Sequence, residues 1–239
     1  MDPAHAFRPF GFAHLVVIGL TVSLPFILAA FVRKSRWPRS EQIVGRFFAL
    51  LLLLNYLGFE IYLASTEGLL WQKALPFQLC DWAMVAIIVA LLTGRERWLE
   101  VAYFWGIGGT LQAILTPDLK YAFPDIHFLT FFIAHSGIVV AIAFMMIVKR
   151  LRPHWISIVR VFAWSELYFV VTITVDLFTG ENYGYLLHKP AAASLLDALS
   201  DQRVVYIFQM HLLALIFYFV LYLPFALYDA ITSARNKLI

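Results

Sequence analysis

The chain has 239 residues, of which 62% are hydrophobic and only 14% are charged. Soluble globular domains carry roughly a quarter charged residues, so this composition excludes an ordinary water-soluble fold and indicates an integral membrane protein. The formal net charge is +3, but the basic residues fall in short clusters between apolar runs, which argues against a nucleic-acid-binding protein. A single cysteine, Cys80, excludes an intramolecular disulfide framework and a metal site built from paired thiolates.

Seven runs of the sequence are long and apolar enough to cross a bilayer, which takes about 20 residues in a helix. The first run is too long for a signal peptide and lacks an Ala-x-Ala exit, so we expect it to remain as a helix. We find no internal repeat or linker and predict an all-α, single helical-bundle domain over residues 1–239. The predicted transmembrane helices are Phe12–Val32, Val44–Ser65, Leu75–Thr93, Leu99–Thr116, His127–Val148, Ile156–Phe178 and Val204–Tyr228.

Basic residues gather in alternate loops between these runs, and the intervening loops have no basic cluster. By the positive-inside rule the basic loops are cytoplasmic, which places the N-terminus outside and the C-terminus inside. We therefore expect a multi-pass protein of the cell membrane, the cytoplasmic membrane of a bacterium. The basic residues are Arg33, Lys34, Arg36, Arg39 and Arg46, then Arg95 and Arg97, then Lys149, Arg150 and Arg152, and finally Arg235 and Lys237 in the tail.

Polar side chains of the predicted helices gather toward the outer surface. At about 1.5 Å per residue, six of them lie roughly 8 to 15 Å below the outer ends of their helices, whereas Glu166 lies near the middle. This one-sided distribution predicts a cavity that opens outward. In the alternative interpretation, each group only hydrogen-bonds a neighbouring helix for about 1 kcal/mol or less. The six residues are Asn55, Glu60, Cys80, Gln112, His135 and His211.

Three glycines of the fourth run, Gly106, Gly108 and Gly109, remove side chains from one stretch of the predicted helix. Such a stretch lets a neighbouring backbone or an acyl chain approach closely. Simple glycine-mediated packing between helices explains the same pattern.

Cys80 is the candidate nucleophile, although most buried cysteines are inert. If Pro76 occupies the first turn of its helix, Cys80 lies near the positive helix N-terminus, which favours a thiolate. Burial opposes ionisation, so a base must lie close by. His135 is the best candidate, because a neutral imidazole can take the thiol proton and later return it to a leaving group, and His211 is the substitute.

Other motifs carry less weight. Tyr183, Tyr185, Lys189 and Pro190 fit a lid or a contact with a lipid headgroup, but an aromatic belt has the same composition. We find no phosphate-binding glycine loop, no His-Glu-x-x-His pair and no serine nucleophile elbow. We therefore expect no metal and no cofactor, although His135 with Glu60 or His211 could hold an ion.

Several stretches together resemble the YwaF-like bacterial membrane proteins and their animal relatives, the transmembrane protein 164 family. The resemblance covers nearly the whole chain and implies the same seven helices. Cys80, Gln112 and His135 match the family pattern, whereas Gln78 stands where the family often has histidine. The stretches are Leu75–Asp81, Tyr103–Ala113 with Thr116–Asp118, Phe132 with His135, and Asn182–Tyr185 with Lys189–Pro190.

The animal relatives are cysteine-dependent acyltransferases, so the resemblance implies Cys80 as the acyl-accepting nucleophile and His135 as its base. We expect a fatty acyl chain to move from a phospholipid to a lysophospholipid or another acceptor through a Cys80 thioester, with Gln112 or backbone amides near Pro76 stabilising the oxyanion. The expected substrate contacts are Asn55, Glu60, Gln78, Gln112, Tyr183, Lys189 and His211.

Two other functions explain the same residues. A transporter or receptor-like protein would hold a small solute in the polar layer, with Cys80 as a wall residue, although transporters often show an internal repeat. A scaffold without a ligand would satisfy the polar layer by its own hydrogen bonds and would leave no cavity.

Overall fold

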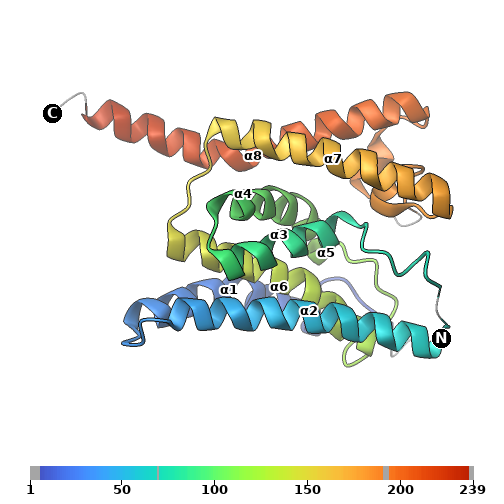
Figure 1. The fold of residues 1–239 in the computed structure, drawn as a ribbon, viewed down its shortest axis with the longest axis horizontal. Coiled ribbons are helices and arrows are strands. Elements are labelled where there is room, and N and C mark those ends of the chain that lie inside the picture. Colours follow the sequence, from blue (N-terminus) through green and yellow to red (C-terminus); the bar gives the residue numbers. More distant parts are fainter. Residues whose placement is uncertain (1–5, 69, 191–193, 237–239) are drawn as a thin grey trace. The chain divides into compact units, whose positions relative to one another are not determined.

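The computed structural model describes residues 6–68, 70–190 and 194–236, the last three without their side chains. Lys237 and the side chain of Arg235, which entered the predicted topology, therefore lie outside the described residues. The chain divides into two compact units, unit 1 from Met1 to Leu151 and unit 2 from Arg152 to Ile239. Figure 1 shows the ribbon of both units.

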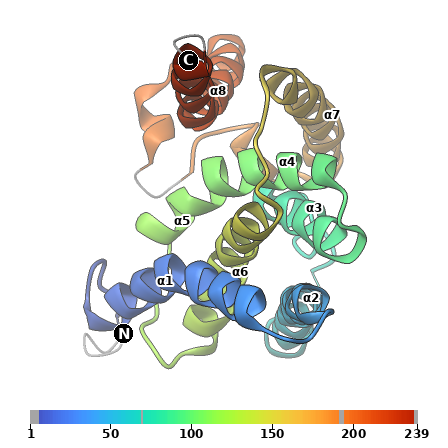
Figure 2. The same ribbon diagram turned by 90° about the vertical axis from the view of Figure 1, so that its left-hand side faces the viewer.

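Unit 1 is a helical bundle built around one central helix, α6. Figure 2 looks along the helices and shows α6 among the others, in agreement with its packing against α1, α2, α3, α5 and η2. Its middle contributes fully buried side chains such as Ile138, Ile142 and Phe144. The elements are α1 (Phe12–Lys34), α2 (Ser40–Thr66), α3 (Leu79–Thr93), α4 (Glu96–Trp105), the π-helix η2 (Gly106–Thr110), α5 (Leu111–Leu115) and α6 (Ile126–Lys149).

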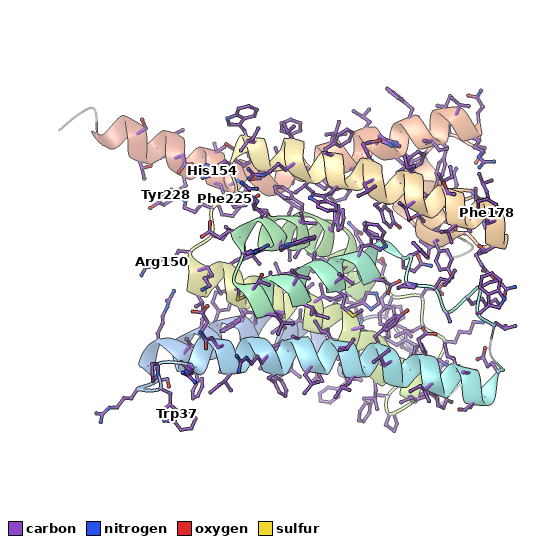
Figure 3. The ribbon with its side chains drawn as sticks, viewed as in Figure 1. Trp37, Arg150, His154, Phe178, Phe225 and Tyr228 are labelled. Atoms are coloured by element: carbon purple, nitrogen blue, oxygen red, sulfur yellow. The ribbon has the colours of Figure 1, made fainter. Side chains whose placement is uncertain are left out.

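The basic loops of unit 1 lie at one end of the bundle. Lys149 at the end of α6 forms an ion pair of 2.6 Å with Glu41 at the start of α2, and Arg33 donates to the carbonyl oxygen of Ile147 at 3.1 Å. In Figure 3, Trp37 and Arg150 lie at this same end. The loops that the positive-inside rule assigns to one side of the membrane are therefore neighbours in unit 1.

Unit 2 consists of two long helices, α7 (Trp155–Thr179) and α8 (Arg203–Asn236), joined by a segment with two short 3₁₀ helices, η3 (Tyr183–Tyr185) and η4 (Leu195–Ala198). The helices are antiparallel: in Figure 3, His154 lies near Phe225 and Tyr228, and Phe178 lies at the opposite end. Arg152 ties this first end together, since it pairs with Asp229 at 2.6 Å and lies over the Tyr228 ring.

Five helices are long and apolar enough to cross a membrane within the described part of the chain: α1, α2, α6, α7 and α8. Large apolar side chains on their surfaces are exposed, as expected for helices that face lipid; Phe12 and Phe178 are each 86% exposed. The all-α class and the multi-pass membrane character are thus confirmed. The other two predicted runs form α3, which has only 15 residues, and the uninterrupted series α4, η2 and α5.

The predicted start of the third helix is wrong by four residues, because α3 begins at Leu79 and not at Leu75. Pro76 therefore precedes the helix instead of lying in its first turn. Gln78 is the N-cap, with extended backbone, and the Asp81 carboxylate accepts a hydrogen bond of 3.0 Å from its backbone N–H. This capping interaction fixes the helix start.

Candidate functional site

Cys80 is the second residue of α3 and is partly buried. The first turn of a helix has backbone N–H groups without intrahelical acceptors, and its partial positive charge stabilises an anion. Asp81 follows directly, but its carboxylate already caps the helix through Gln78. Cys80 therefore lies at a helix N-terminus, as the sequence predicts. It lies in the first turn of α3, whereas the prediction had placed Pro76 in that turn.

His135 on α6 has a defined tautomer. Its Nδ1 lies 2.8 Å from the backbone carbonyl oxygen of Phe131, and the imidazole ring stacks on the Phe131 ring at 4.1 Å between centroids. Because a carbonyl oxygen only accepts hydrogen bonds, Nδ1 carries the proton. In the neutral ring Nε2 then keeps a lone pair and can act as a base.

The π-helix η2 packs against both the Cys80 helix and the His135 helix. A Cβ atom at Gly106 would meet Ile138 and Ile142 of α6, and one at Gly109 would lie 3.2 Å from Leu79 Cδ2 of α3. These two glycines thus serve close helix packing, and protein side chains fill the space beside them.

The same contacts indicate where Cys80 and His135 lie along the bundle. His135 precedes Ile138 by one helical turn and lies on the same face of α6, while Cys80 follows Leu79 directly. The helices that carry the two residues therefore both pack against η2. No hydrogen bond joins the Cys80 thiol to His135 among the residues described, so their contact stays a prediction.

Thr110, the last residue of η2, was not singled out by the sequence analysis. It is only 2% exposed, and its hydroxyl has no hydrogen-bond partner in the described residues. Gln112, the predicted oxyanion donor, is instead exposed on α5. A threonine inside an apolar run looks like an ordinary helix residue, so no sequence signal separates Thr110 from other threonines.

Asn55 and Glu60 lie on α2 in unit 1. The Asn55 side-chain amide donates to the backbone carbonyl oxygen of Thr130 on α6 at 3.0 Å, which links two helices as in the simpler interpretation of the polar layer. Glu60 is partly buried and lies close enough to Asp81 for their charges to interact. Glu60 therefore belongs to the surroundings of the α3 N-terminus.

His211 belongs to unit 2, where it pairs with Glu166. Its Nδ1 lies 2.7 Å from the carbonyl oxygen of Ile207 and therefore carries a proton, and its Nε2 lies 3.4 Å from Glu166 Oε1. The Glu166 carboxyl group therefore lies beside the nitrogen that would act as a substitute base.

Tyr183 and Lys189 lie in the segment between α7 and α8. The Tyr183 backbone N–H donates to Asp176 Oδ1 at 2.8 Å, and Asp176, which the sequence analysis missed, is fully buried. Lys189 Nζ donates to the Leu199 carbonyl oxygen at 2.6 Å and to Asp201 Oδ1 at 2.7 Å. Both predicted substrate contacts thus make structural bonds within unit 2.

An apolar groove of about 510 Å³ lies between α1, α2 and α6 in unit 1. Its walls are almost wholly aliphatic and aromatic, and they include Ser136, whose buried hydroxyl has no hydrogen-bond partner in the described residues. Neither Cys80 nor His135 lines it.

The candidate donors for a metal site are the histidines, the cysteine and the carboxylates of the described residues. The described residues contain no group of three or more histidine, cysteine, aspartate or glutamate side chains that could hold an ion.

His14 is a buried histidine that the sequence analysis passed over. Both of its ring nitrogens are hydrogen-bonded: Nδ1 accepts from the Phe10 N–H at 2.9 Å, and Nε2 lies 2.8 Å from the Ile114 carbonyl oxygen. It is a structural residue that joins α1 to α5.

Comparison with known proteins covers most of the chain. The model of the TMEM164 family matches residues 9–222. An uncharacterized protein of Treponema pallidum (strain Nichols) is 27% identical over 224 residues, which span 90% of this chain and 87% of the relative. No solved structure matches.

Proposed function

The chain belongs to the TMEM164 family, and we propose that it is a membrane-embedded acyltransferase that moves a fatty acyl chain between phospholipids through a thioester on Cys80. The observation that carries the proposal is the hydrogen bond between His135 Nδ1 and Phe131, which leaves the Nε2 lone pair as a base. The helices α6 and α3, which carry His135 and Cys80, both pack against η2.

In the first half-reaction, Cys80 Sγ attacks the ester carbonyl carbon of a phospholipid while His135 Nε2 takes the thiol proton. The bond between the carbonyl carbon and the glycerol oxygen then breaks, and His135 returns the proton to that oxygen. A lysophospholipid leaves, and Cys80 carries the acyl group as a thioester.

In the second half-reaction, the hydroxyl of an acceptor lysolipid attacks the thioester while His135 takes its proton. The carbon–sulfur bond breaks, and the proton passes to Cys80. Each half-reaction develops an oxyanion, and preformed donors stabilise such a charge. We assign this role to the backbone N–H groups of Leu79 and Cys80, since those of Asp81 and Trp82 already donate to the Gln78 carbonyl oxygen. The unpaired hydroxyl of Thr110 takes the place of the exposed Gln112.

We also propose that α3 and the series α4, η2 and α5 cross the membrane, which gives seven spans with the N-terminus outside. At about 1.5 Å per residue, the 15 residues of α3 cover roughly 22 Å of a core about 30 Å thick. The non-helical residues before Leu79 then enter the membrane. Non-helical backbone is tolerated there only inside protein or beside a water-filled cavity, which supports a polar site at Cys80.

The test measures acyl exchange between a labelled diacyl phospholipid and a lysophospholipid with purified protein. We expect no exchange with Cys80→Ala and a loss of about 10² to 10⁴-fold with His135→Ala, the usual contribution of a general base. His154→Ala, which removes an exposed imidazole before α7, serves as the control and should leave exchange unchanged. Equal exchange in all three variants and the wild type would contradict the thiol mechanism.

The same variants separate the proposal from a solute transporter. A transporter would bind or move its solute equally well with Cys80→Ala, because the thiol would only line the cavity wall. An acyltransferase loses its function with this one substitution.

A further inference from the structure

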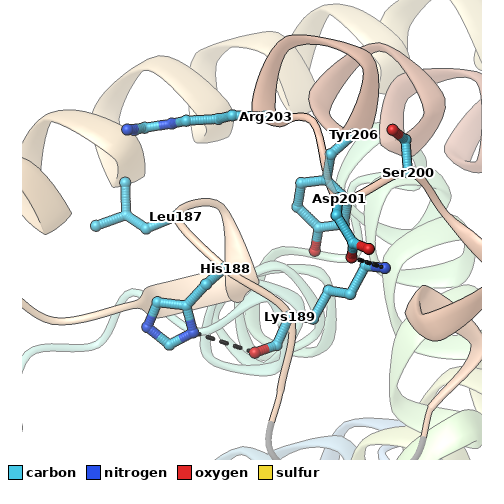
Figure 4. A pocket seen from close by; sticks show the side chains of 7 residues that line it. All are labelled: Leu187, His188, Lys189, Ser200, Asp201, Arg203 and Tyr206. Carbon is cyan, nitrogen blue, oxygen red and sulfur yellow. Dashed lines mark hydrogen bonds and ion pairs between the residues drawn. The ribbon is translucent and has the colours of Figure 1, made fainter.

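A polar pocket of about 330 Å³ lies in unit 2, between residues 187–189 and the segment that leads into α8. Figure 4 shows its side chains: Lys189, Asp201 and Tyr206 form one wall, and Arg203 extends along another beside Leu187. All of these residues belong to unit 2, and none has a part in the thiol reaction proposed for Cys80. The pocket is therefore a separate candidate binding site.

Lys189 supports the pocket wall and does not offer a free charge. Its ammonium group donates to the Leu199 carbonyl oxygen and to Asp201 Oδ1, and it lies 3.5 Å from the Asp197 carbonyl oxygen. Its positive charge is matched by the Asp201 carboxylate. The ion pair therefore joins residue 189 to the segment before α8, and the two residues together add no net charge to the pocket.

Arg203 supplies the uncompensated charge of the pocket. Within the described ranges, no hydrogen bond or ion pair engages its guanidinium group, and Figure 4 shows the group away from Asp201. Guanidinium binds phosphate oxygens through two parallel N–H donors. His188 lies on the opposite side of the pocket, with Nδ1 near the Asn182 amide and the Lys189 carbonyl oxygen, so Nε2 is its remaining polar atom.

Arg203 is also the first residue of α8, a helix of 34 residues. The backbone N–H groups of its first turn have no intrahelical acceptors, and they carry the positive end of the helix dipole. The pocket thus combines a free guanidinium, a helix N-terminus and a concave polar wall. Each of these features favours a group with several negatively charged oxygens.

We propose that this pocket binds a phosphate group, with Arg203 as its anchor, and that the group belongs to a phospholipid headgroup. The lipid as the source of the phosphate follows from the proposed function, because an acyltransferase of this kind must hold phospholipids. The phosphate chemistry itself follows from the pocket alone and does not depend on the thiol.

The test compares binding of didecanoyl phosphatidylcholine and of didecanoylglycerol, which has the same chains without the phosphate, to the full protein in detergent. We expect Arg203→Gln to weaken binding of the phospholipid roughly tenfold, the effect of losing a charge-assisted hydrogen bond, and to leave didecanoylglycerol unaffected. Arg203→Lys should restore part of the affinity. Arg97→Gln, at an exposed arginine of unit 1, is the matched control.

Binding of sodium phosphate alone identifies the source. A headgroup site binds the phospholipid at concentrations at which inorganic phosphate alone shows no saturable binding, whereas a site for the free ion binds inorganic phosphate as tightly as the lipid. Equal phospholipid binding by the wild type and Arg203→Gln would overturn the proposal. Repeating the measurement with Cys80→Ala separates the two proposals, because the pocket should bind phospholipid whether or not the thiol transfers acyl chains.

Discussion

The buried hydroxyl of Thr110 has no hydrogen-bond partner among the residues that the structure describes. A buried hydroxyl without a hydrogen bond costs about 1 to 3 kcal/mol, and Thr110 is 2% exposed. It lies beside Gly109, which contacts the residue before Cys80. A substrate oxygen that accepts from this hydroxyl would remove the cost, which is why we include Thr110 in the proposed oxyanion hole.

We predict that Thr110→Val lowers the rate of acyl exchange by about 10² to 10³-fold, the usual loss for one oxyanion donor. Valine has nearly the same shape and removes only the hydroxyl, so the melting temperature should not fall. Thr174→Val, which removes an exposed hydroxyl of α7, is the control for exchange kinetics. Unchanged exchange with Thr110→Val would remove Thr110 from the mechanism.

The ion pair between Lys189 and Asp201 predicts a pH dependence. The hydrogen bond from Lys189 and its positive charge hold the pKa of Asp201 below its ordinary value. A carboxyl group with a lowered pKa in the folded state stabilises that state above its unfolded pKa of about 4, and the contribution disappears as the pH falls through the folded pKa.

The difference in melting temperature between the wild type and Asp201→Asn isolates this contribution. We expect a constant difference from pH 7 to pH 5 and its disappearance as the pH falls below about 4. The effect should be small, because Asp201 is exposed to solvent. A difference that instead grows on acidification would show that Lys189 does not hold the carboxylate.

The sequence predicted where Cys80 lies along its helix but not what the candidate residues touch. Cys80 at a helix N-terminus follows from the local pattern, but the stacking of His135 on Phe131 depends on side-chain rotamers. Counting depth along a helix says nothing about its face. The sequence analysis therefore chose Gln112, which is exposed, and passed over Thr110, which is buried.

At the scale of elements, the π-helix η2 distinguishes the fourth apolar run from the others. A π-helical turn is rare and often lies at a functional site. Here it places Gly106 against α6 and Gly109 against α3, so that α3, η2 and α6 meet closely. The sequence predicted a glycine-rich helix, but an i→i+5 turn has no reliable sequence pattern.

Gly106→Ala should test this packing. Its added methyl group would meet Ile138 and Ile142, both fully buried, and overpacking of this kind costs about 1 to 3 kcal/mol. Gly58→Ala on α2 meets nothing within 4 Å and should be neutral or slightly stabilising. Thermal melting in detergent compares the two; equal melting temperatures would mean that η2 does not pack tightly on α6.

At the scale of the whole molecule, the apolar runs of the sequence predicted most of the helices. The seven predicted runs agree with the helices α1, α2, α3, α6, α7 and α8 and with the series α4, η2 and α5 to within a few residues at most ends. The largest differences are at Tyr228, beyond which α8 continues to Asn236, at Val44, before which α2 begins at Ser40, and at Leu75, where Pro76 and the capping by Asp81 delay the helix start. Five of these helices meet the length of a span by themselves.

The number of spans can be tested with single cysteines introduced into the Cys80→Ala variant, which has no other thiol. We expect a membrane-impermeant maleimide to label Glu67→Cys and Asp118→Cys from outside intact cells, and Arg97→Cys only after lysis. All three positions are exposed. If α3 and the α4–η2–α5 series do not cross the membrane, all three cysteines will react on the same side.

The intact mass of the protein after incubation with a diacyl phospholipid, in the absence of an acceptor, tests the acyl-enzyme directly. We predict that the mass increases by one acyl group, that neutral hydroxylamine or an added lysophospholipid removes the increase, and that Cys80→Ala shows no increase. Acyl exchange that proceeds without this adduct, or at an equal rate with Cys80→Ala, would contradict the account.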